Sequence, residues 1–309
     1  MGFLLTPTPP YNFDLTMRTY GILPGEVVDS YVDGVYRRVL KIEDEHVLVS
    51  VESIGTVDEP RLRVSVRPNV STKLGREVRR KVRHMLNTDV DVRSFYSAMR
   101  RNRVLSRVVD ELYGLRATKT ESLYEALVIA ITEQQISLRA AVAIRGRIAR
   151  RYGRTIVLGD REYCSFPSED VMARASPQRL RDMGLSARKA EYIVGLSRQV
   201  ARGELNLEGL AALPTEDLVR ELTRIRGVGT WTAEYAVVRG LGRFDALPAD
   251  DAALRRVVSA LYYCGREVTG EEVRRLLDEF GQHRGLAAFY LLGLELLGRE
   301  PFTTRPRYC

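Results

Sequence analysis

Two adjacent acids at the start of an expected helix are the clearest chemical signal in this sequence. Asp250 and Asp251 end the segment LPADD and precede AALRRVV, whose apolar spacing predicts a helix. The dipole and unpaired N–H groups of a helix start favour a charged carboxylate. We expect Asp251 to act as a reactive carboxylate while Asp250 caps or orients the helix. Simple capping of the helix is the alternative for either residue.

A glycine-flanked turn lies upstream of these acids. Gly227 and Gly229 enclose Val228 in IRGVGTW, between two segments with helical spacing. Glycine permits a positive φ and the close approach of another backbone, and the first N–H groups of the next helix favour an anion. Lys and Arg outnumber Asp and Glu by 48 to 40 in this chain, so a DNA phosphate is the natural anion, and we expect Gly227, Val228, Gly229 and Thr230 to contact one. A tight connection between two helices is the competing interpretation.

Two aromatic side chains follow the turn. Trp231 and Tyr235 are one helical turn apart, and Trp231 is the only tryptophan of the chain. Their π systems can stack on an electron-poor base, so we expect both to belong to a base pocket. The alternative is ordinary packing in a core.

Composition limits the classes of protein that fit. The chain has 309 residues, 45% of them hydrophobic and 28% charged, and no apolar run approaches the length that crosses a bilayer. We expect a soluble globular protein of two domains that does not bind a membrane. Forty-eight Lys and Arg against forty Asp and Glu give a formal charge of +8, which would attract a polyanion.

The periodicity predicts an α+β fold. Residues 36–67 alternate as antiparallel strands do, and Val78, Val82 and Met85 then share a helical face. The basic remainder of REVRRKVRH could face phosphate, or could be a solvated helix surface. Nearly all later segments have helical spacing. We predict a small N-terminal α+β domain (1–110) with an antiparallel sheet and a larger all-helical domain (111–309), with the boundary within 105–118.

The sequence resembles the helix–hairpin–helix (HhH-GPD) DNA glycosylase superfamily. Leu222, Ile225, Gly227, Val228 and Gly229 match its hairpin, near 222–235, and LPADD matches its P-x-D-D segment. Within the superfamily the chain is most similar to the 3-methyladenine DNA glycosylase II (AlkA-type) branch, whose W-T-A-x-Y helix and R-G-L-G turn occur in WTAEYAVVRGLG. ALVIAITEQQIS and LRDMGLSARKAEYIVGLSRQVARGEL are also similar to helices of this branch. The resemblance covers about residues 115–300.

The resemblance implies a monofunctional DNA glycosylase of base excision repair, which flips out and hydrolyses alkylated purines such as 3-methyladenine and 7-methylguanine. The departing purine leaves an oxocarbenium-like sugar, which one carboxylate, here Asp251, can stabilise. Trp231 stands where bifunctional relatives carry a Schiff-base lysine, so no lyase activity is expected. Hypoxanthine or 8-oxoguanine as the lesion, and a non-enzymatic DNA-structure binder, are the alternatives. A non-enzymatic binder needs the glycine turn but not the Asp251 carboxylate, so this residue distinguishes it from an enzyme.

Further roles are implied by the same resemblance. Gln135, with Gln134 beside it, stands where the family inserts a residue into the gap that the flipped base leaves, although a polar helix end explains both glutamines. Tyr290 stands in the last core helix, where relatives place base-pocket aromatics. Main-chain carbonyls of Thr223, Ile225 and Gly227 correspond to a site for Na⁺ or K⁺.

The expected partner is double-stranded DNA with damaged bases, bound by a monomer, and no cofactor is required. Cys164, Cys264 and Cys309 are widely spaced without CxxC, which argues against a disulfide framework, a zinc site and an iron–sulfur cluster. The N-terminal residues lack the basic region of a signal peptide. We therefore expect a cytoplasmic protein, associated with the nucleoid if the source is prokaryotic.

Overall fold

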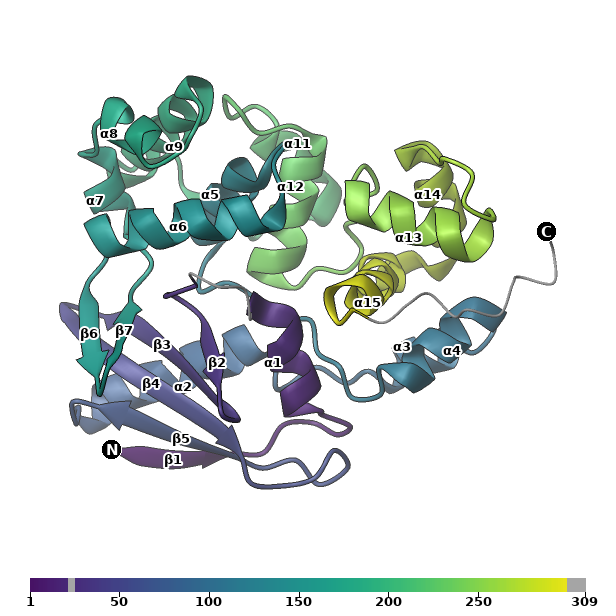
Figure 1. Ribbon diagram of the computed structural model, residues 1–309, viewed down its shortest axis with the longest axis horizontal. Helices are drawn as coiled ribbons and strands as arrows, with labels where there is room; N and C mark the ends of the chain where they lie inside the picture. The colour runs from purple at the N-terminus through teal and green to yellow at the C-terminus, as the bar shows by residue number, and fades with distance from the viewer. Residues whose placement is uncertain (22–25, 299–309) are drawn as a thin grey trace.

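A five-stranded antiparallel sheet forms the N-terminal part of the protein (Figure 1). The computed structural model describes residues 1–21 and 26–298. Its strands, in the order β1-β5-β4-β3-β2, are β1 (Gly2–Leu5), β2 (Ser30–Val32), β3 (Val35–Ile42), β4 (Glu45–Ser53) and β5 (Leu62–Arg67). The predicted alternation is confirmed in β5, where Leu62, Val64 and Val66 are buried while the residues between them are exposed.

Two helices pack on one face of this sheet. They are α1 (Phe13–Gly21) and α2 (Thr72–Leu86). As predicted, Val78, Val82 and Met85 of α2 lie on one face, and they join the apolar cluster of the sheet. The arginines of α2 are thereby directed away from the sheet core.

The remainder of the chain is mainly helical. Its elements are α3 (Arg93–Met99), α4 (Arg103–Glu111), α5 (Leu123–Glu133), α6 (Leu138–Tyr152), β6 (Thr155–Leu158), β7 (Arg161–Cys164), α7 (Glu169–Ala173), α8 (Pro177–Asp182), α9 (Ala187–Ala201), α10 (Leu207–Leu210), α11 (Thr215–Leu222), α12 (Thr230–Ala236), η1 (Val237–Leu241), α13 (Ala252–Tyr262), α14 (Gly270–Leu277), η2 (Asp278–His283) and α15 (Arg284–Leu296). The predicted α+β class is confirmed. Among the described residues, no helix is both long and apolar enough to span a bilayer.

A short β-hairpin interrupts the part that was expected to be all helical. Strands β6 and β7 extend from the end of α6 to the sheet, on the face opposite α2 (Figure 1). Tyr163 packs there against Val39 and Leu48, and the N–H of Cys164 donates to the carbonyl of Val27 at 2.8 Å. The strand sequences TIVL and REYC do not alternate strictly between apolar and polar residues, so periodicity did not indicate them.

The chain begins to pack with the C-terminal helices before the domain boundary that was expected near residue 110. Helices α3 and α4 lie beside α15 (Figure 1), and their side chains Phe95, Met99 and Leu105 share one cluster with helices α13–α15. Residues 93–111 therefore pack with the C-terminal helices, because their apolar faces contact that core and not the sheet. The division into folding units at residue 110 stays a prediction.

A buried ionic network joins the sheet to the helical part. The guanidinium of Arg38 on β3 is fully buried and pairs with Asp29 at 2.9 Å and with Glu125 of α5 at 2.7 Å. Burial raises the pKa of the Glu125 carboxyl, and the charge of Arg38 opposes this rise. The phenol of Tyr36 donates to Asp29 at 2.5 Å. Charged groups in a dry interior stabilise a structure only while each keeps its partner.

Candidate active site and DNA interface

The turn between α11 and α12 requires glycine at position 227. Gly227 has φ +91°, and a Cβ there would lie 2.2 Å from Cδ2 of Tyr192. Val228 is buried in the core, and its N–H donates to the carbonyl of Ile225 at 3.0 Å. The expected DNA contact through Val228 is therefore wrong, because both its side chain and its N–H are already used inside the turn.

The exposed part of the turn is the start of α12. Gly229 and Thr230 are exposed, Gly229 precedes the helix with extended backbone, and the space around its Cα is open. Helix α12 continues through η1 to Leu241. The N–H groups of its first turn point out at this end, and together with the helix dipole they favour an anion such as a phosphate.

Replacing Gly227 by alanine is expected to lower the affinity for undamaged duplex DNA and to destabilise the fold by about 1–3 kcal/mol, because the residue needs a positive φ and the Cβ meets Tyr192. Fluorescence anisotropy and thermal unfolding measure the two effects. Gly229→Ala is the matched control, since its backbone is extended and its surroundings are open. An unchanged unfolding midpoint in Gly227→Ala would contradict the steric argument.

Asp251 is held by groups from two helices. Its Oδ1 accepts from the N–H groups of Ala253 at 2.9 Å and Leu254 at 3.0 Å, so it caps α13. Its Oδ2 accepts from Nε1 of Trp231 at 3.3 Å. Asp250 is exposed and does not cap this helix. The expected division of roles is therefore wrong in one respect, because Asp251 itself is the capping residue.

The two aromatic side chains of α12 lie together beside this acid. The ring centroids of Trp231 and Tyr235 are 5.4 Å apart, and both side chains are half-buried. Burial raises the pKa of the Tyr235 phenol, and a hydrogen bond to Glu133 adds to the rise. Glu133 also pairs with Arg145 at 2.5 Å. The sequence did not single out Glu133, because an acid at a helix end carries no distinctive signal.

The two glutamines after α5 have different environments. The side-chain Nε2 of Gln134 donates to the Gly227 carbonyl and to Oγ1 of Thr232, both at 2.9 Å. Gln135 is exposed and has φ +54°, so it forms the apex of the loop. The structure thus brings this loop against the turn before α12. Gln135 has the exposure that insertion into a duplex needs, and Gln134 ties the two segments together.

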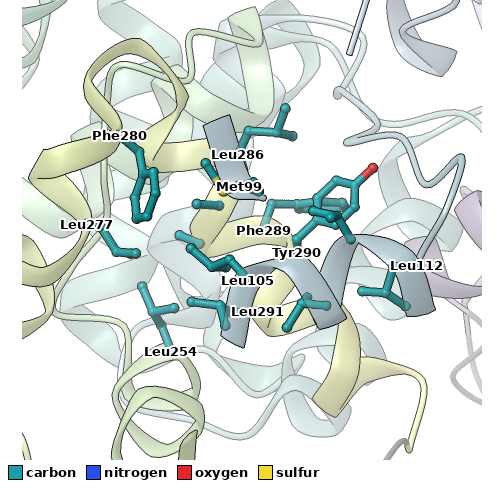
Figure 2. Packing of buried hydrophobic residues seen from close by; sticks show 14 of the residues in the cluster. Met99, Leu105, Leu112, Leu254, Leu277, Phe280, Leu286, Phe289, Tyr290 and Leu291 are labelled. Carbon is teal, nitrogen blue, oxygen red and sulfur yellow. The ribbon is translucent and has the colours of Figure 1, made fainter. Parts of the chain in front are cut away.

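Tyr290 does not join Trp231 and Tyr235. It is fully buried among Met99, Phe289 and Leu291 in the C-terminal core, as Figure 2 shows. Its hydroxyl donates to the Leu115 carbonyl at 2.7 Å and lies 3.0 Å from the hydroxyl of Tyr96. The expected place of Tyr290 in a base pocket is wrong, because α15 is buried on nearly all sides and its spacing does not indicate which face meets a ligand.

The segment that leads from α12 to Asp251 is fixed by two arginines. Arg274 on α14 pairs with Glu234 of α12 at 2.8 Å and donates to the carbonyl of Leu247 at 3.0 Å. The Nε of Arg284 donates to the carbonyl of Asp245 at 2.6 Å. These contacts link segments that are distant in the chain, and no sequence pattern indicates them. They fix the conformation of the segment that precedes Asp251.

Two of the three main-chain carbonyls of the expected cation site already accept hydrogen bonds. The carbonyl of Ile225 accepts the N–H of Val228, and that of Gly227 accepts from Gln134. Each carbonyl oxygen has a second lone pair, so a monovalent cation remains compatible with Thr223, Ile225 and Gly227. This site stays a prediction. Within residues 1–21 and 26–298, no group of three or more His, Cys, Asp or Glu could hold a metal ion.

Two of the three cysteines fall within the described residues. Cys164 is buried with a free thiol. Cys309 lies outside the described residues.

Comparison with known proteins agrees with this geometry. The profile of the family "HhH-GPD superfamily base excision DNA repair protein" matches residues 128–283. A DNA-3-methyladenine glycosylase of Bacillus subtilis is 31% identical over 215 residues, which are 70% of this chain and 71% of that protein. The solved 3-methyladenine DNA glycosylase of Archaeoglobus fulgidus has a TM-score of 0.84 at 30% identity, covering 95% of this chain and 98% of the other.

A third relative was solved with DNA. The Schizosaccharomyces pombe 3-methyladenine DNA glycosylase Mag1, in complex with abasic DNA, has a TM-score of 0.54 at 25% identity, covering 64% of this chain and 94% of that one. The chain belongs to the HhH-GPD superfamily of base excision DNA repair proteins. Its similarity to the 3-methyladenine DNA glycosylases of Bacillus subtilis and Archaeoglobus fulgidus confirms the predicted AlkA-type branch.

Proposed function

We propose that the protein is a monofunctional DNA glycosylase that removes alkylated purines, such as 3-methyladenine and 7-methylguanine, from double-stranded DNA. The observation that carries the proposal is the contact between Asp251 and the indole of Trp231, beside the exposed start of α12. The names of the relatives support the alkylated base as the substrate class. Action as a cytoplasmic monomer stays a prediction.

Each group has a distinct task in this reaction. The N–H groups at the start of α12 hold a phosphate of the damaged strand, and the exposed Gln135 fills the space that the flipped base leaves. The rings of Trp231 and Tyr235 stack on the base, whose positive charge favours contact with a π face. Asp251 then stabilises the sugar cation as the bond to the purine breaks, and water completes the hydrolysis.

The chemistry of the amines near this site supports the proposed absence of lyase activity. Trp231 has no amine that could form a Schiff base with the sugar. The nearby Nζ of Lys189 donates to the carbonyl oxygens of Thr132 and Gln134, and burial lowers its pKa. These hydrogen bonds hold the Lys189 amine at the end of α5, where it supports the loop.

The test is the release of free bases from methylated duplex DNA, with strand cleavage measured in the same samples. We expect 3-methyladenine to appear without strand breaks, and borohydride to trap no covalent protein–DNA adduct. Parallel duplexes with hypoxanthine or 8-oxoguanine test the other lesions. Release of only those bases would redirect the substrate assignment, and DNA binding without release of any base would favour a non-enzymatic binder.

A further inference from the structure

A strongly basic groove lies along α2, on a surface that the proposed reaction does not use. Its volume is about 560 Å³. Among its described lining residues, the charged ones are Arg76, Arg79, Arg80, Arg83, Lys119 and Asp89. Five cations and one acid give a formal charge of +4, because burial lowers the pKa of the lining His84 to about 4 and keeps it neutral. We call this surface the α2 groove.

The α2 groove is built on fixed elements. Asn87 ends α2 and its Nδ2 donates to the carbonyl of Ala117 at 3.0 Å, while the N–H of Lys119 donates to the carbonyl of Met85 at 2.8 Å. The segment that carries Lys119 is therefore bound to the end of α2. The backbone positions that carry the cations keep their spacing without a ligand, so binding one costs little ordering of the backbone.

The arginines of the groove remain accessible to a ligand. The guanidinium of Arg80 lies 3.7 Å from the carboxylate of Glu77, which is a long ion pair, and the Arg80 side chain is 72% exposed. Arg83 pairs with Asp89 at 3.0 Å, and both side chains are about half exposed. Exposed ion pairs of this kind contribute at most about 1 kcal/mol, so a stronger anion can displace the carboxylates.

The α2 groove lies at the opposite end of α12 from the turn at Gly229. A Cβ on Gly242, just after η1, would lie 2.8 Å from Cδ of Lys119. Thr230–Leu241 is continuous helix, which at 1.5 Å per residue spans about 18 Å. The two anion-favouring surfaces are thus separated by the length of this helix and by the protein packed around it.

We propose that the α2 groove is a second DNA-binding site, which holds the phosphate backbone of a duplex segment other than the one that presents the damaged base. The proposal shares with the proposed function only the assumption that DNA is the ligand. Arg76, Arg80 and Arg83 lie at i, i+4 and i+7 and span about 10 Å of α2. Duplex DNA carries one charge per about 1.7 Å, so this row meets several phosphates.

Arginine is the residue type that favours phosphate here. The guanidinium group binds phosphate oxygens through two parallel hydrogen bonds, whereas lysine acts as a point charge. The contacts proposed here are made to phosphates, which carry no sequence information, so binding is expected without regard to sequence or damage. A protein with two DNA sites can hold one segment while the site at Asp251 tests another, and can pass between segments without full release.

The experiment measures bridging of two undamaged 30-base-pair duplexes, one with a donor dye and one with an acceptor dye. The unmodified protein is expected to bring the dyes together, and Arg76→Glu/Arg80→Glu to reduce this transfer at least about tenfold, because charge reversal repels phosphate. Arg63→Glu/Arg202→Glu reverses two exposed arginines outside the groove and is the matched control. The salt slope of binding is expected to fall by about 2 in the groove variant only.

Several outcomes would overturn the inference. They are no bridging by the unmodified protein, equal bridging by the groove variant, and an equal loss in the control variant. If the groove variant loses binding to a polyglutamate peptide but still bridges DNA, the groove is assigned to an acidic protein instead. Groove-dependent bridging by an unmodified protein that releases no base would remove the proposed function and leave this inference standing.

Discussion

Asp251→Asn is expected to reduce the single-turnover rate of base release by about 10²–10³-fold or more, with little change in affinity for undamaged duplex DNA. The amide cannot stabilise the sugar cation as a carboxylate does. Asparagine is as good an N-cap as aspartate, so its Oδ1 can still accept from Ala253 and Leu254. The fold should therefore survive, and the loss measured by free-base release will report on the reaction.

Asp250→Asn is the matched control, since it removes the same charge one position earlier from an exposed side chain that does not cap α13. It is expected to release base at nearly the unmodified rate. Equal losses in both variants would mean that general negative charge matters, and that Asp251 has no special position. An active Asp251→Asn would remove the carboxylate from the mechanism.

Arg38→Met is expected to lower the free energy of unfolding by about 3–5 kcal/mol, because it leaves Asp29 and Glu125 without their buried cation. Chemical denaturation measures the change. Arg63→Met is the control on the same sheet, where Arg63 pairs with Glu52 at 2.9 Å with both side chains exposed. Its loss should stay below about 1 kcal/mol, and equal losses in the two variants would contradict the role of burial.

The deficit of Arg38→Met should also depend on pH. Burial raises the pKa of Glu125 in the folded protein above its unfolded value, and removing Arg38 takes away the charge that opposes this rise. Between these two pKa values the folded state binds more protons than the unfolded state, so stability falls as pH rises. The deficit should therefore be smaller at pH 5 than at pH 8, as denaturation at the two pH values will show.

The sequence predicted features that depend on local pattern. Alternation within residues 36–67 located β3, β4 and β5 but not β1 and β2, and the glycines with Thr230 located the turn before α12. Contacts between distant segments were not predictable in this way. Nothing in the spacing of Glu234 and Arg274 indicates that they pair, and the ring of Trp231 and the carboxylate of Asp251 are twenty residues apart in the chain.

The errors arose where one residue type suits two environments. Tyr290 is an aromatic residue on a helix that is buried on nearly all sides, so its position along α15 could not distinguish a ligand pocket from a core. Val228 lies between two glycines in an exposed turn, yet its apolar side chain is drawn into the core and its N–H closes the turn. Only the path of the chain in space decides such cases.

The carboxamide of Gln134 makes two parts of the proposed DNA interface move together. It joins the loop with Gln135 at its apex to the Gly227 carbonyl and to Thr232 in the first turn of α12. The loop cannot be displaced relative to the start of α12, where a phosphate is proposed to bind, unless both hydrogen bonds break. In the proposed DNA complex, insertion of the Gln135 loop into the base stack and binding of the backbone at α12 would therefore be coupled through Gln134.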